Sequence, residues 1–255
     1  MIGTRTPFRV SFAGGGSDLK SFYSRHPGCV ISTTINKYMF IFVHPFSDER
    51  IQVKYSMTEL VNNINEIKHP IVRDALKKLG IIGIDVNSIA DIPAGTVIGS
   101  SGAFTVGLLN ALYAYLGEKT AKDILAKEAC EIEIDILGEP IGKQDQYSAA
   151  IGGLNLITFN PDDTVNVEPV IMPQGKYREL ENNLLFFYVG GARPAREILA
   201  DQQQNTLSDR KTFASIKRMT ELAINLKDSL STGQLQDVGP MLDEGWSLKK
   251  NLTLK

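Results

Sequence analysis

The chain has 255 residues, of which 43% are hydrophobic and 22% charged, an ordinary composition for a globular protein that argues against disorder. The formal net charge of -2 provides no general basic surface for nucleic acid, so an anionic substrate must be held by a few placed cations. The N-terminal residues contain no apolar core of a signal peptide, and no apolar run reaches the ~18 residues of a membrane span. A cytoplasmic protein is therefore expected.

Residues that could bind zinc are few. Cys29 and Cys130 form no CxxC pattern, so free thiols are expected. His26, His44 and His69 show no metal-ligand spacing, so a zinc site is not predicted.

The first third of the chain is predicted to consist mainly of strands. Apolar residues alternate with Arg9 and Ser11 over residues 6–12, a pattern typical of a half-buried strand, and the glycines at 14–16 end it. Further extended segments are expected over residues 29–34, 38–44, 50–56 and 84–92, with a short helix between Pro70 and Gly80.

Two helices are predicted in the middle of the chain. Residues 100–116 are apolar nearly all round, which is typical of a buried helix, and Gly117 follows as a stop signal. Residues 121–137 are amphipathic, with Thr120 as N-cap and with an apolar stripe formed by Leu125, Ala129, Ile132 and Ile136.

The last third is predicted to be mostly helical. A strand over 154–159, a turn at 161–163 and a very apolar strand over 184–189 precede helices over 195–204, 210–230 and 235–250. The change to helix near residue 182 divides the chain into domains 1–182 and 183–255. Since no later strand covers the edge of 184–189, we expect either a fragment or another element at that edge.

One segment places small residues and hydroxyls on the first turn of the buried helix: Gly99, Ser100, Ser101, Gly102 and Ala103. The unpaired N–H groups and the dipole of a helix N-terminus favour phosphate, and hydroxyls can bind a phosphate oxygen or Mg2+. An ordinary serine cap, with the glycines present for close packing, is an equal alternative.

Five charged residues are candidates for chemistry. Glu133 has only apolar or small neighbours three and four residues away, so it needs a partner, a cation or a metal unless it lies half-exposed. Asp145 follows a glycine in a loop or short helix, where a cap or turn role is the alternative. Arg9 and Asp18 flank the first glycine run, and Arg9 can pair with Asp145, bind a phosphate or lie on the surface. Arg193 stands near a helix start, where an anion is favoured.

The common nucleotide-binding motifs are absent: GxGxxG, Walker A, HRD and DFG do not occur. Three other segments resemble the GHMP kinases (galactokinases and homoserine, mevalonate and phosphomevalonate kinases), and among them the bacterial D-glycero-D-manno-heptose 7-phosphate kinases. The segments are RTPFRVSFAGGGSD at 5–18, Pro93 followed by IGSS at 98–101, and GKQDQ at 142–146. The resemblance runs from Arg5 to about Lys250.

The resemblance implies an α+β fold, with an N-terminal domain like domain 2 of ribosomal protein S5 and a truncated ferredoxin-like C-terminal domain. It implies that ATP phosphates lie over the helix start at 99–103. It further implies that Ser101 (or Ser100) and Glu133 hold Mg2+, and that Asp145 is the base facing the substrate hydroxyl.

The resemblance also implies roles around the substrate. Arg9 would neighbour the base and contribute positive charge, and Asp18 would contact sugar hydroxyls. Gly15 and Gly16 stand where galactokinases carry a Glu-His pair, so they would leave room for a different or larger sugar. Arg193 matches an arginine of the heptose kinase pattern and would bind the distal phosphate of the substrate.

Three features depart from the family pattern. Val97 replaces a glycine of the usual GLGSS loop, and a β-branched residue does not readily adopt a positive φ. Val189 replaces a threonine, and the glycine-rich third motif is not found before Lys255. These departures bear on turnover more than on the fold.

The leading hypothesis is transfer of the ATP γ-phosphoryl group to the anomeric hydroxyl of D-glycero-D-manno-heptose 7-phosphate, for nucleotide-heptose and surface polysaccharide synthesis. The alternatives are a GHMP kinase for another sugar and a truncated, non-catalytic homologue that binds a ligand. An S5-like RNA-binding protein suits the fold but not the charge. The expected partners are ATP, Mg2+ and a sugar phosphate, without nucleic acid or membrane, and a homodimer is left open.

Overall fold

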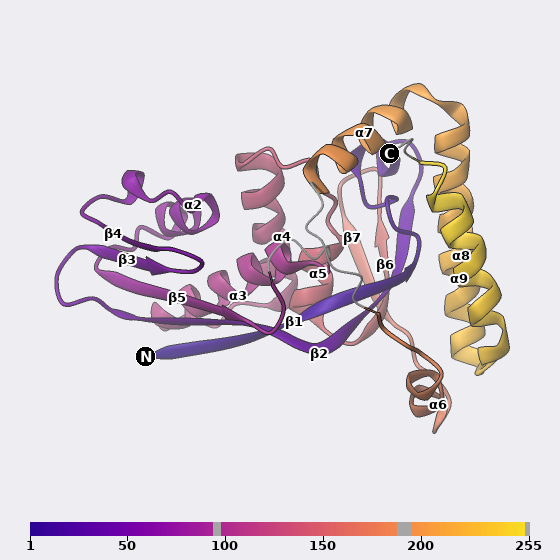
Figure 1. Ribbon diagram of the computed structural model, residues 1–255, viewed down its shortest axis with the longest axis horizontal. Helices are drawn as coiled ribbons and strands as arrows, with labels where there is room; N and C mark the ends of the chain where they lie inside the picture. Colours follow the sequence, from indigo (N-terminus) through magenta and orange to yellow (C-terminus); the bar gives the residue numbers. More distant parts are fainter. Residues whose placement is uncertain (94–97, 188–194, 253–255) are drawn as a thin grey trace. The chain divides into compact units, whose positions relative to one another are not determined.

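The computed structural model describes residues 1–93, 98–187 and 195–252 (Figure 1). The chain forms two compact units whose segments interleave along the sequence. Unit 1 comprises Met1–Arg9, Thr34–Glu139 and Asp145–Gly152, and unit 2 comprises Val10–Thr33, Pro140–Gln144 and Gly153–Lys255. The mixture of helices and sheet confirms the α+β class. The division into domains 1–182 and 183–255 stays a prediction.

The strands of unit 1 follow the order β4-β3-β5-β2. They are β2 (Gly28–Pro45, in this unit from Thr34 onward), β3 (Ile51–Lys54), β4 (Thr58–Val61) and β5 (Ile84–Ala90), and β1 (Ile2–Ala13) pairs with β2. β2 and β5 are antiparallel with Val43 opposite Val86, whereas β3 and β5 are parallel. The strands predicted over 29–34 and 38–44 are one continuous strand, because no glycine or proline interrupts the residues between them.

The helices of unit 1 include the buried helix α3, which packs against α2 and α4. They are η1 (Ile64–Glu66), α2 (Pro70–Leu79), α3 (Ser100–Tyr115), α4 (Lys122–Cys130), η2 (Glu131–Ile136) and α5 (Gln144–Ile151). Leu108 and Leu112 of α3 belong to one apolar core with Ile41 and Val86 of the sheet, as the all-round apolar pattern predicts.

Strand β1 runs along α3. Thr4 Oγ1 donates a hydrogen bond to the carbonyl of Gly107 at 2.9 Å, and the backbone N–H of Arg9 donates to the carbonyl of Ile98 at 3.3 Å. These contacts place Arg9 beside Ile98, which precedes the N-cap residue of α3.

The helix predicted over 121–137 differs from the prediction in two ways. Ala121, not Thr120, occupies the N-cap position of α4, and it makes no side-chain cap hydrogen bond. From Glu131 to Ile136 the helix widens into a π-helix, in which Leu137 N–H donates to the carbonyl of Ile132, five residues earlier. The wider turn rotates the residues that follow, so Ile136 is exposed instead of lying on the apolar stripe.

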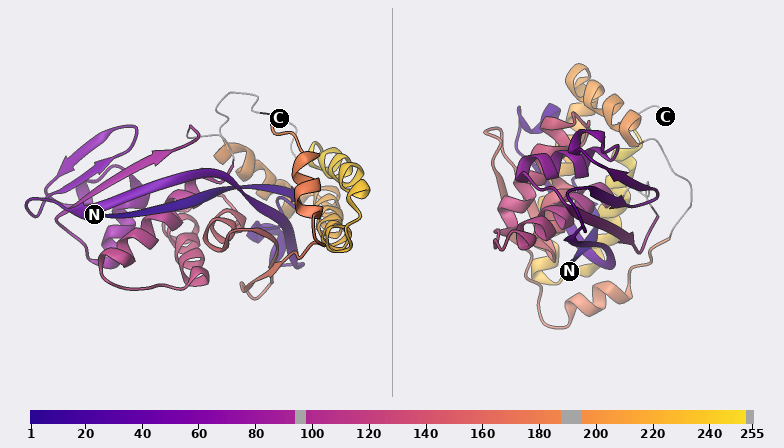
Figure 2. Two further views of the ribbon diagram at one scale, coloured as in Figure 1. Left: turned by 90° about the horizontal axis from the view of Figure 1, so that it is seen from below. Right: turned by 90° about the vertical axis from the view of Figure 1, so that its left-hand side faces the viewer.

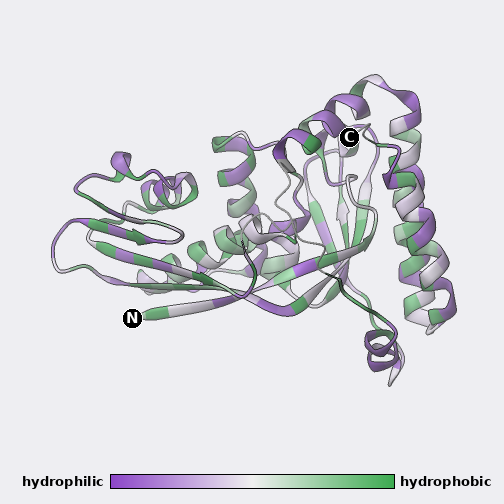
Figure 3. Cartoon of the chain, viewed as in Figure 1, coloured by the Kyte–Doolittle hydropathy of each residue, from purple (hydrophilic) through white to green (hydrophobic). Residues whose placement is uncertain are grey.

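Unit 2 contains the remaining strands and most of the C-terminal helices. Gly28–Thr33 of β2 pairs antiparallel with β6 (Leu154–Phe159), which pairs with β7 (Val165–Pro169). The helices are α1 (Lys20–Tyr23), α6 (Lys176–Asn182), α7 (Ala195–Ser208), α8 (Arg210–Thr232), η3 (Leu235–Asp237) and α9 (Val238–Lys249). α8 and α9 lie side by side (Figure 1, Figure 2), and polar and apolar residues alternate around both (Figure 3).

The prediction of an apolar strand over 184–189 is wrong for the part that the structure describes. Residues 184–187 lie in no strand, and Leu185, Phe186 and Phe187 are exposed. A strand requires a partner for its backbone hydrogen bonds, and none of the described strands pairs with this segment. Residues 188 and 189 lie outside the described residues. The sequence analysis also missed α6 and β7.

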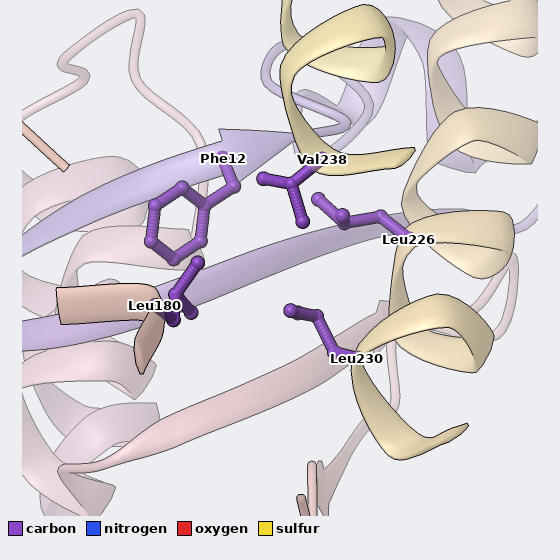
Figure 4. Close-up of a pocket in the computed structure, with 5 residues that line it drawn as sticks. All are labelled: Phe12, Leu180, Leu226, Leu230 and Val238. Carbon is purple, nitrogen blue, oxygen red and sulfur yellow. The ribbon is translucent and has the colours of Figure 1, made fainter. Parts of the chain in front are cut away.

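A small apolar pocket lies in unit 2 (Figure 4). The side chains that point toward one another around it are Phe12, Leu180, Leu226, Leu230 and Val238. Because all five are apolar, the pocket does not fit a nucleotide phosphate or a sugar. None of the described helices combines the length and apolarity that a bilayer crossing requires.

Candidate active site

The start of α3 is packed tightly against other parts of unit 1. Gly99 occupies the N-cap position with φ of 77°, a left-handed conformation that favours glycine. A Cβ atom at Gly102 would lie 2.8 Å from Asp145 Cβ and 3.1 Å from the backbone nitrogen of Gln146. The glycine at 102 therefore lets the first turn of α5 approach α3, as the close-packing interpretation of the sequence predicts.

A carboxylate lies behind this helix start. Glu133, on the π-helix, is 1% exposed, and its Oε2 accepts a hydrogen bond from the hydroxyl of Ser101. Its Oε1 accepts a hydrogen bond from Gln146 Nε2 at 2.9 Å. Burial raises the pKa of Glu133, while hydrogen bonds from Ser101, Gln146 and Thr105 act in the opposite direction. The alternative of a half-exposed Glu133 is therefore wrong, and the carboxylate has the polar partners that its apolar neighbours require, while its role at a metal stays a prediction.

Asp145 and Arg9 form an ion pair at the same place. Arg9 Nε donates to Asp145 Oδ1 at 2.7 Å, and the two side chains are 14% and 25% exposed. Asp145 lies in the first turn of α5, where a carboxylate is favoured by the helix dipole. The pairing of Arg9 with Asp145 that the sequence analysis considered is thus present.

Asp18 and the glycine run form a second cluster, within unit 2. Asp18 is buried, and its two carboxylate oxygens accept hydrogen bonds from the backbone N–H groups of Gly16 at 3.1 Å and Gln144 at 3.3 Å. A side chain at Gly142 would overlap Asp18 Oδ2, so the chain can pass Asp18 closely only with glycine there. Gln144 is the last residue of its segment of unit 2, and Asp145 follows it in the sequence.

The predicted site residues therefore fall into two described groups. Within unit 1 the structure brings together Arg9, Glu133, Asp145 and the helix start Gly99, Ser100, Ser101, Gly102 and Ala103. Within unit 2 it brings together Gly15, Gly16 and Asp18. Arg193 and Val97 lie outside the described residues.

Three further polar residues lie at these clusters, and the sequence predicted no function for them. Gln146 belongs to the GKQDQ segment, and its position in a buried run of α5 is the signal that could have identified it. Gln202 and Lys249 contact each other and the glycine run at 15–16, but they are far from it in sequence and no local pattern marks them.

The donor set around Glu133 fits a metal that arrives with a nucleotide. Within residues 1–93, 98–187 and 195–252, no three His, Cys, Asp or Glu side chains form a group that could hold a metal by themselves. Mg2+ is commonly bound by one or two carboxylates together with water and substrate phosphates. The carboxylate of Glu133 and the hydroxyl of Ser101 supply oxygen ligands of that type.

Comparison with protein families and curated proteins gives consistent matches. Residues 64–153 match the GHMP kinases N terminal domain. The chain is 28% identical to a D-glycero-alpha-D-manno-heptose 7-phosphate kinase of Campylobacter jejuni, over 98% of this chain and 77% of the relative. It is 24% identical to a galactokinase of Pyrococcus furiosus, over 98% of this chain and 78% of the relative.

The fold is also that of a solved kinase structure. The crystal structure of a D-glycero-D-manno-heptose 1-phosphate kinase from Bacteriodes thetaiotaomicron matches with a TM-score of 0.82 and 24% sequence identity. The match covers 98% of this chain and 79% of that chain. At this identity the match supports the fold alone.

Proposed function

Since this chain carries the N-terminal domain of the GHMP kinases and is an ATP-dependent sugar phosphotransferase, we propose that its acceptor is the anomeric hydroxyl of D-glycero-D-manno-heptose 7-phosphate. The product would serve nucleotide-heptose synthesis for surface polysaccharide. The names of the two heptose kinase relatives place the phosphate at different positions, 7 and 1, so the acceptor position has to be tested directly.

The observation that carries this proposal is the ion pair of Arg9 and Asp145 against the start of α3. Phosphoryl transfer needs positioning and charge stabilisation more than covalent chemistry by the protein. In our proposal, Asp145 is the base that accepts the proton of the substrate hydroxyl, and Arg9 holds the carboxylate in place. The α3 start at 99–103 binds the ATP phosphates through the N–H groups of its first turn.

Glu133 and Ser101 are the proposed protein ligands of Mg2+. The bound ion would neutralise charge on the ATP phosphates. Gln146 and the Ser101 hydroxyl, which contact the two oxygens of Glu133, hold this carboxylate toward the helix start.

Substrate binding is proposed for residues of unit 2. Asp18 would accept hydrogen bonds from sugar hydroxyls, and Gly15 and Gly16 would let the sugar approach the backbone. Arg193 would bind the phosphate of the substrate. The hydrogen bonds that the buried Asp18 carboxylate accepts from two backbone N–H groups hold this acceptor in a fixed position, which supports the proposal.

The proposed domain assignment is an S5 domain 2-like domain over 1–182 and part of a ferredoxin-like domain over 183–255. The family match over 64–153, which lies inside the first of these, supports the assignment. The cytoplasmic location and a homodimer stay predictions.

The test is a phosphoryl-transfer assay followed by 31P NMR of the product. The acceptors compared are D-glycero-D-manno-heptose 7-phosphate, D-glycero-D-manno-heptose 1-phosphate, D-galactose, L-fucose and mevalonate, each with Mg-ATP. Rapid turnover of the 7-phosphate, with a new anomeric phosphate signal, supports the proposal. Preference for another acceptor contradicts the substrate, and calorimetric binding of Mg-ATP without any turnover favours the ligand-binding homologue.

A further inference from the structure

We propose that Gln202 and Lys249 bind the phosphorylated end of the substrate at the Gly15-Gly16 run, and thereby select a sugar phosphate over the free sugar. The inference rests on the proposed function for the identity of the substrate. Both side chains belong to unit 2, Gln202 to α7 and Lys249 to the last position of α9.

The first argument is an unsatisfied donor. Gln202 is 2% exposed, and its Nε2 group has no hydrogen-bond partner among the described residues. Buried amide donors are nearly always paired, because leaving one unpaired costs free energy. A ligand oxygen at the glycine run would supply the missing acceptor.

The orientation of this amide is fixed by its neighbour. Lys249 Nζ lies 3.3 Å from Gln202 Oε1, and an ammonium group can only donate. The oxygen of the amide must therefore face Lys249, which leaves Nε2 on the side of Gly16. A side chain at Gly16, whose φ is 101°, would overlap Nε2.

The second argument is the placement of a positive charge. Lys249 Nζ also lies 3.4 Å from the carbonyl oxygen of Gly15. These two contacts hold the ammonium group beside the glycine run, and a hydrogen bond from an ammonium group to a phosphate oxygen is charge-assisted, with a length of about 2.8 Å. A phosphate oxygen at the same place would form a shorter and stronger contact with the ammonium group.

The third argument is that α7 is held firmly in unit 2. Arg25 Nη2, from outside α7, donates to the carbonyl of Thr206 at 2.5 Å. Within α7, Thr206 Oγ1 donates to the carbonyl of Gln202 at 2.6 Å. Asn205 Nδ2 donates to the carbonyl of Leu252 at 3.1 Å, beyond the end of α9. These contacts fix Gln202 relative to both the α1 region and the segment that follows Lys249.

The arrangement changes the interpretation of Gly16. The resemblance implies that glycine leaves room for a larger sugar, but the amide of Gln202 occupies the space that a side chain would take. In our inference the glycines admit two donors from α7 and α9, one neutral and one charged. The neighbouring Asp18 supplies an acceptor, so donors for phosphate and an acceptor for hydroxyls lie around one short loop.

The test measures binding and turnover separately. Isothermal titration calorimetry without ATP gives the Kd of D-glycero-D-manno-heptose 7-phosphate, D-mannose 6-phosphate and D-mannose for the wild type, Lys249→Gln and Gln202→Met. Steady-state assays give KM and kcat for the heptose phosphate and for ATP. The matched controls are Lys250→Gln and Gln204→Met, which alter exposed residues on the same helix or next to it.

We expect each site variant to weaken binding of both sugar phosphates by about 10-fold or more, the loss typical of one hydrogen bond to a charged group. Binding of D-mannose and the KM for ATP should change less than about twofold, and Lys249→Arg should restore part of the phosphate affinity. The control variants should match the wild type.

Two outcomes overturn the inference: the wild type binds neither sugar phosphate, or the variants bind them as tightly as the wild type does. If the wild type binds the heptose phosphate but does not phosphorylate it, and the variants lose that binding, the proposed function fails while the inference stands.

Discussion

Gln146 donates its side-chain amide to Glu133 at 2.9 Å, although both residues are almost completely buried. The other oxygen of the carboxylate faces the Ser101 hydroxyl, so both donors are neutral. Gln146 Oε1 is itself buried and has no hydrogen-bond partner among the described residues. The amide is therefore held by its contact with Glu133 and not by a wider network, which makes the pair sensitive to substitution.

Replacing Gln146 by Met, which has a similar volume and no donor, should leave Glu133 Oε1 buried without a partner. We expect a loss of about 1–3 kcal/mol in the free energy of unfolding, measured by urea denaturation. If Gln146 positions a metal ligand, the Mg2+ concentration for half-maximal activity should also rise, a change that loss of stability alone does not cause. Gln204→Met is the control on an exposed helix surface, and an unchanged Mg2+ requirement would contradict the positioning role.

Replacing Asp145 by Asn should leave the fold intact, since the amide has the same shape as the carboxylate. The substitution removes the proposed base, so kcat should fall by about 10²–10⁴-fold while the KM for ATP stays nearly constant. Steady-state kinetics measures kcat and the KM for ATP, and circular dichroism shows whether the fold is intact. Asp162→Asn, at an exposed turn, is the matched control. Turnover near that of the wild type would remove Asp145 from the mechanism.

The sequence predicted the core elements well and the long-range contacts poorly. The all-round apolar pattern identified α3, and Pro70 and Gly80 marked the two ends of α2 because their backbone preferences are local. The π-helix at 131–136 was missed, since its wider turn depends on tertiary contacts and not on residue propensity.

In the candidate site, too, local features were predictable from the sequence and long-range contacts were not. Glu133 was identifiable because an isolated carboxylate among apolar neighbours needs a partner, but its partner Gln146 was not. Gln202 and Lys249 lie 47 residues apart, and only the fold brings them to the same glycine run. An apolar segment such as 184–187 was assigned to a strand from composition alone, whereas pairing depends on a partner strand.

The buried thiol of Cys29 should make the stability of the protein depend on pH at alkaline values. The thiol is free, as predicted; it is also buried, and burial raises its pKa from 9.0 to about 12. The pKa of Cys29 is higher in the folded than in the unfolded protein, so folding favours the neutral thiol. The contribution of this thiol to the free energy of unfolding is therefore fully present below pH 9 and is lost as the pH rises from 9 to about 12. The free energy of unfolding of the wild type relative to Cys29→Ala should therefore fall by roughly 1 kcal/mol per pH unit in this range. Urea denaturation at pH 8, 9.5 and 10.5 measures it, and a constant difference would show that the thiolate is tolerated in the fold.

Gly102→Ala tests whether the α3 start positions Asp145. The new methyl group would meet Asp145 Cβ at 2.8 Å and the α5 backbone at 3.1 Å, and neither can move without shifting the start of α5. We expect a loss of about 1–3 kcal/mol of stability, typical of overpacking, together with a fall in kcat because the Asp145 carboxylate moves relative to Arg9.

Gly245→Ala is the matched control, since a Cβ atom there meets nothing within 4 Å and its φ is not positive. That substitution, inside α9, should be neutral or should stabilise the protein by up to about 1 kcal/mol, because alanine loses less backbone entropy in a helix. If Gly102→Ala behaves like this control in both denaturation and kcat, the packing of α3 against α5 does not govern the position of Asp145. If stability falls but kcat does not, the contact supports the fold without setting the geometry of the proposed base.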